Sequence, residues 1–254
     1  MKTGSKQNTK KEIIERQKKA AALRAAELVP DGTVIGLGSG STVAYLIEEL
    51  GRRKQNGQID IKVVTSSYES QFLAHRYGIE VLALAGVCKP ALMIDGADEI
   101  DGSGNAIKGK GGAQTLEKIL ASLSERYILI ADSSKLVDTL GRNSPVPIEL
   151  IPEALEEVKI ELNRLGCKSN IRYGSGKVGP VITDLGNMIV DAYFESIENP
   201  RKLARYLDGI PGLIEHGLFV NMVDQVVAGL YQNNEIKTEL KNFKKTKRLS
   251  VCLK

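Results

Sequence analysis

Short apolar segments of strand length alternate with helical segments through the first half of this chain, and no other feature constrains its fold as much. Residues 33–37 form an apolar run, a loop of glycine and hydroxyl residues follows, and residues 43–50 carry apolar side chains at helical spacing. The pattern continues to residue 131, with strands expected at 61–65, 81–84, 91–94 and 127–131 and helices at 68–77 and 116–124. It predicts a Rossmann-like α/β domain whose mostly parallel sheet is covered on both faces. Ligands bind such sheets beyond the carboxyl ends of the strands.

The order of elements changes after residue 145. Strands are expected at 146–151, 169–173, 181–183, 188–192 and 213–219, with helices at 153–165 and 200–207 and a hairpin joining 181–183 to 188–192. The order β-α-β-β-α-β predicts a second, smaller ferredoxin-like α+β domain. The expected organisation is a basic arm (1–19), a Rossmann-like catalytic domain (20–144 and 220–236), the ferredoxin-like domain (145–219) and a mobile basic tail (237–254). An amphipathic helix is expected at 10–29.

Positive charge is concentrated at the two ends of the chain. The formal net charge is +4, but residues 1–19 carry +5 and residues 237–254 carry +6, which leaves −7 on the remainder. Basic ends can contact nucleic-acid phosphates without sequence preference. Phe243 is the one aromatic residue among them, so we expect no specific nucleic-acid binding.

Cysteine content and hydropathy predict a cytoplasmic protein without a membrane segment. The three cysteines, Cys88, Cys167 and Cys252, show no paired spacing, so no disulfide framework is expected. Cys88 and Cys167 adjoin apolar stretches, and we expect buried, unreactive thiols there. The chain has no apolar run of about 18 residues to span a membrane and no apolar leader segment near residue 1.

The loop Gly36-Leu37-Gly38-Ser39-Gly40-Ser41-Thr42 is suited to hold a phosphate. Its small residues leave backbone N–H groups accessible, and the following helix places its positive end behind them. A dinucleotide fingerprint would need glycine at Ser41, and a P-loop would need lysine directly after Gly40. A small phosphomonoester is therefore the favoured ligand, and a tight turn without a ligand is the alternative.

Charged residues follow other predicted strands. Asp95 and Asp98 end the strand at 91–94, at the edge where ligands bind, whereas Glu99 and Asp101 fit solvated surface acids. A divalent metal held by these acids remains open, although His75, the nearest histidine in sequence, has no recognisable ligand spacing.

A second glycine-rich loop, Lys108-Gly109-Lys110-Gly111-Gly112, precedes the helix expected at 116–124. Side chains on a helix lean toward its N-terminus, so Glu117 would point back at this loop and at Lys108. The alternative for Glu117 is an exposed, favourable charge near a helix N-terminus. Lys135 could reach the same sheet edge. No histidine lies within these motifs, so any proton transfer would fall to carboxylates and lysines.

Together these motifs resemble the ribose-5-phosphate isomerase A family. The resemblance runs from about residue 15 to 236, in family order, through Gly38-Ser39-Gly40-Ser41-Thr42, Asp95-Gly96-Ala97-Asp98-Glu99, Lys108-Gly109-Lys110-Gly111-Gly112, Glu117-Lys118, Ala131-Asp132-Ser133-Ser134-Lys135, Ile210-Pro211-Gly212 and Gly217-Leu218-Phe219. It implies interconversion of ribose 5-phosphate and ribulose 5-phosphate, without cofactor or metal, by a homodimer or homotetramer.

The resemblance also implies residue roles. Glu117 would be the general base that moves a proton between C2 and C1 through an enediolate. Lys108 and the backbone of residues 109–111 would stabilise the enediolate oxygen, while Asp95 and Asp98 would bind sugar hydroxyls and assist ring opening. The expected substrate-binding residues are Ser39, Gly40, Ser41, Thr42, Asp95, Gly96, Ala97, Asp98, Lys108, Gly109, Lys110, Gly111 and Lys135. Lys110 and Leu116 depart from the family, which commonly has glycine and a polar residue there.

Three other functions remain open. A non-catalytic sugar-phosphate sensor could keep the loop at residues 38–42 without needing Glu117 beside Lys108. An aminosugar-phosphate isomerase/deaminase would be expected to place a histidine near its acids. A nucleic-acid binder would use the basic ends.

Overall fold

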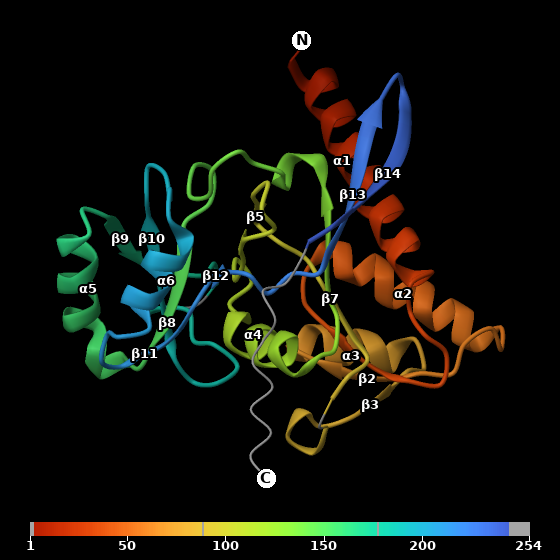
Figure 1. Cartoon of the computed structure of the whole chain (residues 1–254), viewed down its shortest axis with the longest axis horizontal. Coiled ribbons are helices and arrows are strands. Elements are labelled where there is room, and N and C mark those ends of the chain that lie inside the picture. Colours follow the sequence, from red (N-terminus) through yellow and green to blue (C-terminus); the bar gives the residue numbers. More distant parts are fainter. Residues whose placement is uncertain (1–2, 88, 177, 244–254) are drawn as a thin grey trace.

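A seven-stranded sheet forms the centre of the molecule and confirms the predicted fold class. The computed structural model describes residues 3–87, 89–176 and 178–243. The strand order is β14-β13-β7-β4-β1-β2-β3, and every neighbouring pair is parallel except β13 with β14. Figure 1 shows the β13–β14 end of this sheet beside α1. The strands are β1 (Val34–Leu37), β2 (Lys62–Thr65), β3 (Glu80–Val81), β4 (Leu92–Asp95), β7 (Tyr127–Asp132), β13 (Gln225–Gln232) and β14 (Glu235–Asn242).

Helices cover both faces of this sheet. Successive side chains on a strand point to opposite faces, so neighbouring residues of a central strand pack into two different cores. Ile94 of β4 belongs to the core formed with α1 (Thr3–Ala26), α2 (Ser41–Gln55) and α3 (Tyr68–Arg76). The preceding Met93 belongs to the core formed with α4 (Gln114–Leu123). All six residues of β7 are buried, as expected for a strand covered on both faces.

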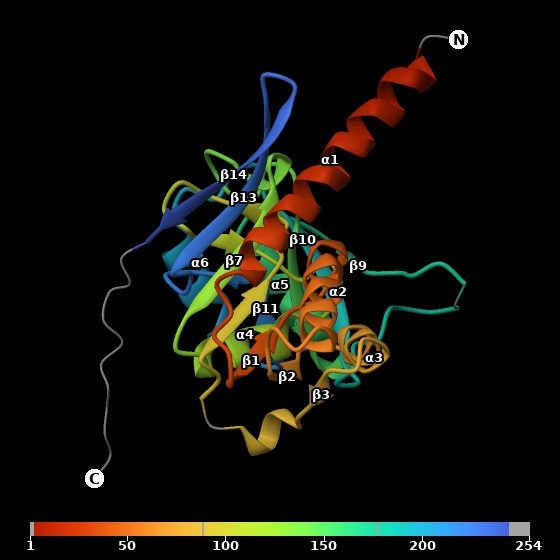
Figure 2. The same ribbon diagram turned by 90° about the vertical axis from the view of Figure 1, so that its right-hand side faces the viewer.

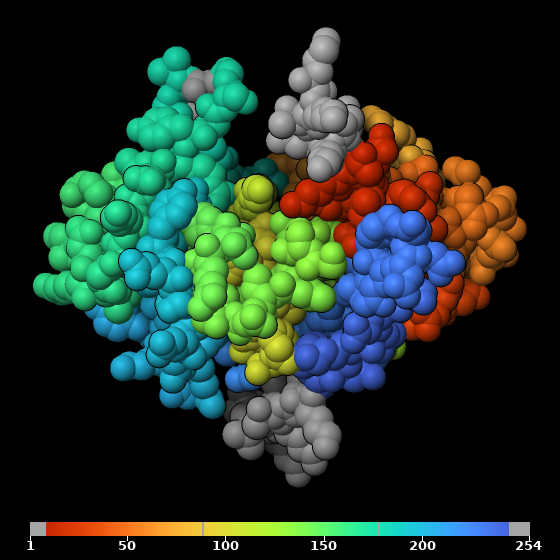
Figure 3. All heavy atoms as spheres, turned by 90° about the horizontal axis from the view of Figure 1, so that it is seen from above, coloured from red at the N-terminus to blue at the C-terminus, as the bar shows by residue number. Residues whose placement is uncertain are grey.

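A second group of elements, here named the antiparallel unit, packs around its own core. It comprises β8 (Val146–Leu150), α5 (Leu155–Arg164), β9 (Lys168–Ile171), β10 (Met188–Tyr193), α6 (Pro200–Leu207) and β11 (Leu213–His216). Its sheet order, β11-β8-β10-β9, is antiparallel throughout and follows the β-α-β-β-α-β sequence that was predicted. The strand expected at 181–183 is reduced to a single bridge between Ile182 and Met188. Figure 3 shows this unit, green to cyan, on the side of the molecule opposite to α2, in orange.

A small sheet that the sequence did not predict joins the two parts. It has the order β12-β6-β5 and consists of β5 (Glu99–Ile100), β6 (Ala106–Ile107) and β12 (Leu218–Phe219). The strand expected at 213–219 is therefore divided between β11 and β12, at Gly217. The Gly217 carbonyl accepts the Lys108 N–H at 2.9 Å, and a Cβ at Gly217 would lie 2.2 Å from the Lys108 carbonyl oxygen. Only glycine permits this close approach.

Both ends of the described chain differ from the prediction. The helix expected at 10–29 begins at Thr3 and ends at Ala26, so most of the expected basic arm belongs to α1, which packs on α2, β7 and β13. Residues 237–242, expected to be mobile, pair with β13 as part of β14 (Figure 2). Ile236 and Leu240 are the half-buried apolar residues of β14, too few to produce a strand pattern. Residues 244–254, with Cys252, lie outside the described residues, as does Cys88.

The structure also bears on Cys167 and on membrane-spanning helices. Cys167 is buried, as expected, and burial raises the pKa of its thiol to about 11, which favours the less reactive thiol form. Among the helices that the structure describes, none combines the length and apolar character needed to cross a membrane.

Candidate active site

The loops after β1, β2, β4 and β6 surround a pocket of about 510 Å³ at the carboxyl edge of the parallel sheet. Every expected substrate-binding or catalytic residue lines this pocket except Asp95, which is completely buried beneath it. The short connections after parallel strands all emerge at one edge, and this brings together residues that lie far apart in the chain.

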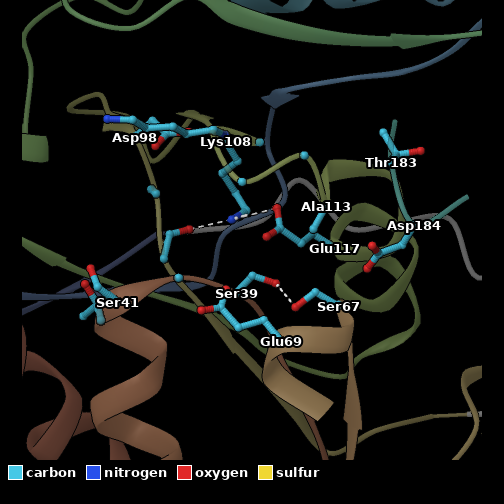
Figure 4. Close-up of a pocket in the computed structure, with 18 of the residues that line it drawn as sticks. Ser39, Ser41, Ser67, Glu69, Asp98, Lys108, Ala113, Glu117, Thr183 and Asp184 are labelled. Atoms are coloured by element: carbon cyan, nitrogen blue, oxygen red, sulfur yellow. Dashed lines mark hydrogen bonds and ion pairs between the residues drawn. The ribbon is translucent and has the colours of Figure 1, made fainter. Parts of the chain in front are cut away.

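Lys108 is at the centre of the site, between the carboxylates of Asp95 and Glu117. Figure 4 shows its side chain directed at Glu117. Its Nζ lies 2.7 Å from Oδ2 of Asp95 and 3.2 Å from Oε2 of Glu117. The same ammonium donates a hydrogen bond of 2.6 Å to the Gly96 carbonyl. Lys108, Asp95 and Glu117 are all buried, so Coulomb interactions between them are stronger than they would be at the surface.

Glu117 is the carboxyl group of this cluster that is suited to exchange a proton near neutral pH. Burial and the charge of Asp95 raise its pKa, against the lowering effect of Lys108, to about 8. Burial also raises the pKa of Asp95, but Asp95 accepts two backbone N–H bonds and has the shorter contact to Lys108. Burial alone would lower the pKa of Lys108, yet Asp95 and Glu117 together raise it, so the ammonium stays charged.

Asp95 also holds the first glycine loop against the cluster. Its Oδ1 accepts the N–H groups of Ser39 (3.2 Å) and Gly96 (2.7 Å). A Cβ on Gly38 would lie 1.8 Å from the same Oδ1, so only glycine leaves room for the carboxylate. The loop continues through Gly40, whose φ of 96° is in the region that favours glycine, and α2 begins at Ser41. The positive N-terminus of α2 therefore faces the pocket.

The sequence analysis missed Lys18 as a member of the site. Lys18 was assigned to a basic arm, but α1 brings its Nζ to 3.1 Å from Ser41 Oγ and 2.7 Å from Glu15 Oε1. Lys18 lines the pocket together with Lys135, which the sequence did predict. Two ammonium groups thus line the pocket that contains the loop at residues 36–42, here called the phosphate-type loop, and that of Lys18 contacts it directly. No local sequence pattern marks this lysine as part of the site, because its contact with Ser41 spans 23 residues.

Ser67 was also missed. Its hydroxyl accepts the Ser70 N–H at the start of α3, and it accepts a hydrogen bond of 2.8 Å from Ser39 Oγ. Ser70 Oγ in turn donates to the Gly38 carbonyl at 2.6 Å. The position of Ser67 just beyond the end of β2, a strand of the parallel sheet, was the signal in the sequence that could have assigned it to the site.

The antiparallel unit supplies the opposite wall of the pocket through Thr183 and Asp184. Asp184 Oδ2 accepts the Tyr68 N–H at 3.2 Å, across to α3. Thr183 Oγ1 donates at 2.7 Å to Glu149, a buried residue of β8 that also accepts the hydroxyl of Thr115 in α4. The wall is therefore anchored to the helix that carries Glu117.

The expectation that Glu99 is a solvated surface acid is wrong. Glu99 is 1% exposed and accepts the N–H groups of Gly141, Asn143 and Ser144 at 2.6–2.7 Å. Backbone donors satisfy the buried charge, so Glu99 organises the loop before β8. Asp101 accepts N–H groups of the turn at residues 103–105.

In each of two acidic clusters of the described chain, a lysine ammonium group contacts at least one carboxylate oxygen that a metal ion would need as a ligand. Lys108 already bridges Asp95 and Glu117. Among the described residues, one group has donor atoms close enough for a metal: Asp208, Glu215 and His216. There Lys118 Nζ lies 2.5 Å from Glu215 Oε1 and 2.7 Å from the His216 carbonyl. Glu215 therefore has an internal cation as its partner, and Asp208 Oδ1 lies 3.1 Å from His216 Nε2.

Lys110 fits its place in the second glycine loop without backbone strain. Its φ is not positive, in contrast to Gly109 (97°) and Gly112 (78°). Its N–H donates to Asp98 Oδ2 at 3.0 Å while its side chain is exposed. Leu116, the other departure from the family pattern, is half-buried and does not line the pocket.

Comparison with known proteins agrees with this geometry. A family model described as ribose 5-phosphate isomerase A matches residues 62–233, and a model of the DeoR C-terminal sensor domain matches residues 14–95. The second match stops before Lys108 and Glu117. The chain is 46% identical over 225 residues to ribose-5-phosphate isomerase A of Methanothermobacter thermautotrophicus, covering 89% of this chain and 99% of the relative.

Solved structures show the same relationship. A D-ribose-5-phosphate isomerase in complex with phospho-erythronic acid superposes with a TM-score of 0.85 at 41% identity, covering 90% of this chain and 99% of that one. Ribose 5-phosphate isomerase A from Methanocaldococcus jannaschii gives a TM-score of 0.82 at 39% identity, covering 88% and 98%. With this coverage and identity, the chain belongs to the ribose-5-phosphate isomerase A family.

Proposed function

We propose that the protein is an aldose–ketose isomerase that interconverts D-ribose 5-phosphate and D-ribulose 5-phosphate, with Glu117 as the general base. The observation that carries this proposal is the contact of 3.2 Å between Glu117 Oε2 and Lys108 Nζ, in a pocket that also contains a phosphate-type loop. An enediolate reaction requires a base for the carbon-bound proton and a cation beside the developing oxyanion, and this pocket contains both.

The phosphate would bind at the end of the pocket formed by the first glycine loop. Ser41 and Thr42 lie at the N-terminus of α2, and Lys18 and Lys135 add positive charge beside them. This arrangement would fix the anionic end of the open-chain sugar, so that C1 and C2 reach Glu117.

Proton transfer would proceed in two balanced steps. The Glu117 carboxylate takes the proton from C2 of the aldose, the C1=C2 bond forms, and the C1 carbonyl oxygen becomes an enediolate oxygen. Glu117 then returns the proton to C1 while the O2 proton moves to O1, which leaves a C2 carbonyl. Lys108 and the N–H groups of the second glycine loop would stabilise the negative oxygen. The reaction is an internal redox exchange, so the proposal needs no cofactor.

Asp95 and Asp98 would have different roles. Asp98 lines the pocket, so we assign it to the sugar hydroxyls and to ring opening. Asp95 has no exposed surface. It would act through the groups it holds, Lys108 and the Ser39 N–H, rather than by touching the sugar as the resemblance implied.

The decisive experiment is an assay of ribulose 5-phosphate formation from ribose 5-phosphate in the presence of a chelator. We expect turnover by the wild type and a loss of about 10³-fold in Glu117→Gln, because a positioned general base contributes about 10²–10⁴-fold in rate. Glu125→Gln is the matched control, since Glu125 is exposed and pairs with Lys89 outside the pocket. Inactive wild type or a fully active Glu117→Gln would contradict the proposal. Activity that is lost in chelator would contradict its metal-free part.

We further propose that the protein acts in the cytoplasm as a homodimer or homotetramer, organised in a Rossmann-like catalytic domain, which includes α1 and β14, and a smaller ferredoxin-like domain. Its cysteine content and its family membership support these proposals. Light scattering of the purified protein measures the oligomeric state.

A further inference from the structure

Arg172, which directly follows β9, reaches from the antiparallel unit to the loop that carries Lys108. Its Nη1 lies 3.0 Å from the Gly109 carbonyl oxygen and 3.0 Å from the Lys110 carbonyl oxygen. Its other nitrogens form a fork with Asp191 of β10, in which Nε is 2.9 Å from Oδ2. Both side chains are largely buried, at 15% and 14% exposure. One guanidinium thus binds a carboxylate and two backbone carbonyls.

These contacts determine where two peptide N–H groups of the loop point. In a planar trans peptide, the C=O and N–H bonds point in opposite directions, and no cis peptide occurs in the described chain. With the carbonyls of Gly109 and Lys110 directed at Arg172, the N–H groups of Lys110 and Gly111 must point away from it. Lys110 N–H does so, since it donates to Asp98 at 3.0 Å. Asp98 and Gly111 both line the pocket.

We propose that Arg172 is a positioning residue, held by Asp191, which fixes the second glycine loop so that the Gly111 N–H faces the reacting oxygen of the substrate while the Lys110 N–H holds Asp98. This inference rests on the proposed isomerase function. Hydrogen-bond donors stabilise a developing oxyanion most when their direction is fixed before the reaction. A cation bound to the carbonyl end of a peptide also polarises that peptide and strengthens its N–H as a donor.

Substituting Arg172 tests the inference. Arg172→Met keeps the side-chain length but removes the fork, and we expect kcat to fall about tenfold or more, since losing an oxyanion donor costs about 10²–10³-fold. KM for ribose 5-phosphate should change less than about threefold, because the phosphate binds at the other end of the pocket. The inhibition constant of phospho-erythronic acid, whose planar carboxylate resembles the enediolate, should rise in proportion to the loss of kcat/KM.

Two further variants separate orientation from charge. Arg172→Lys keeps a positive charge but lacks the planar fork, so we expect it to recover only part of the lost kcat. Asp191→Asn weakens the fork and should lower kcat less than Arg172→Met does. The double variant Arg172→Met with Asp191→Asn should be no slower than Arg172→Met alone, because both residues act through one contact.

The control is Arg164→Met, which removes an arginine of the same unit that is 66% exposed and pairs with Glu161 on α5. It should keep wild-type kcat and KM. Circular dichroism establishes that each variant is folded, and if Arg172→Met does not fold, Asp191→Asn provides the comparison. The inference is wrong if the folded variants keep kcat within about twofold of wild type, or if KM rises while kcat holds. An inactive wild type would instead overturn the proposed function, and this inference with it.

Discussion

Two buried carboxyl groups share one ammonium group in this site. Asp95 and Glu117 both contact Lys108, and the charge of the half-buried Asp98 contributes to the raised pKa of Glu117. A single cation does not fully compensate two buried carboxylates. Asp95 also accepts two backbone N–H bonds, and the raised pKa of about 8 suits Glu117 to exchange a proton during catalysis.

The pH dependence of kcat/KM follows from this tuning. The base must be ionised, and the pKa of Glu117 is about 8, so we expect kcat/KM to rise about tenfold per pH unit between pH 6 and 7 and to level off above pH 8. Initial rates across this range, corrected for ionisation of the substrate phosphate near pH 6, provide the measurement. A profile that stays flat down to pH 5 would mean that Glu117 keeps an ordinary carboxyl pKa.

The turn between β1 and α2 shows how an element depends on one missing Cβ atom. Gly38 has no positive φ, so its backbone would accept alanine. The space where Cβ would lie is instead occupied by the Asp95 carboxylate of β4. Two neighbouring strands thus hold the phosphate-type loop and the central ion pair in one register.

Gly38→Ala should consequently displace Asp95 and break its contact with Lys108. We expect the free energy of unfolding to fall by about 3 kcal/mol, as for other broken buried ion pairs, together with a large loss of kcat. Chemical denaturation followed by circular dichroism checks the stability. Gly86→Ala is the matched control, because its Cβ would meet no atom within 4 Å and its φ is also not positive. Equal stability of the two variants would show that the loop can move away from Asp95.

At the scale of the whole molecule, the site is assembled from parts that are remote in sequence. The parallel sheet contributes the phosphate-type loop and Asp95, α4 contributes Glu117, and the antiparallel unit contributes one wall and the Arg172 contact. The molecule also extends its parallel sheet with the β13–β14 hairpin, beside α1. Stability and catalysis can therefore be separated by substitutions in β14, which lies away from the pocket residues.

Leu240 tests the contribution of β14. This half-buried side chain packs against the core under α1, so Leu240→Asp should lower the free energy of unfolding by about 1–2 kcal/mol, somewhat less than full burial of a leucine contributes. Thr238→Asp, an exposed position of the same strand, should leave stability unchanged within about 0.5 kcal/mol. Both variants should keep kcat/KM within about twofold when folded. A stable Leu240→Asp would mean that β14 does not need this contact.

Local patterns were sufficient for most of the parallel sheet and for much of the candidate site. A strand, a glycine loop and a helix follow one another within a few residues, and their order alone implies a common edge for residues 39–42, Asp98 and Lys135. Glu117 could be predicted to face Lys108 because side chains lean toward the N-terminus of a helix. The two-residue strands β5, β6 and β12 could not be predicted, since they are too short to show periodicity.

By itself, the sequence determined the alternating α/β architecture, the phosphate-type loop and the meeting of Lys108 with Glu117, because each depends on spacing over a few residues. Only the tertiary structure decided that Lys18 belongs to the site, that Glu99 is buried and that Arg172 binds a loop 62–63 residues away. A lysine, glutamate or arginine has the same local sequence pattern whether it is solvated or buried. Its environment is set by long-range packing, and that packing is where its charge acquires a partner and a function.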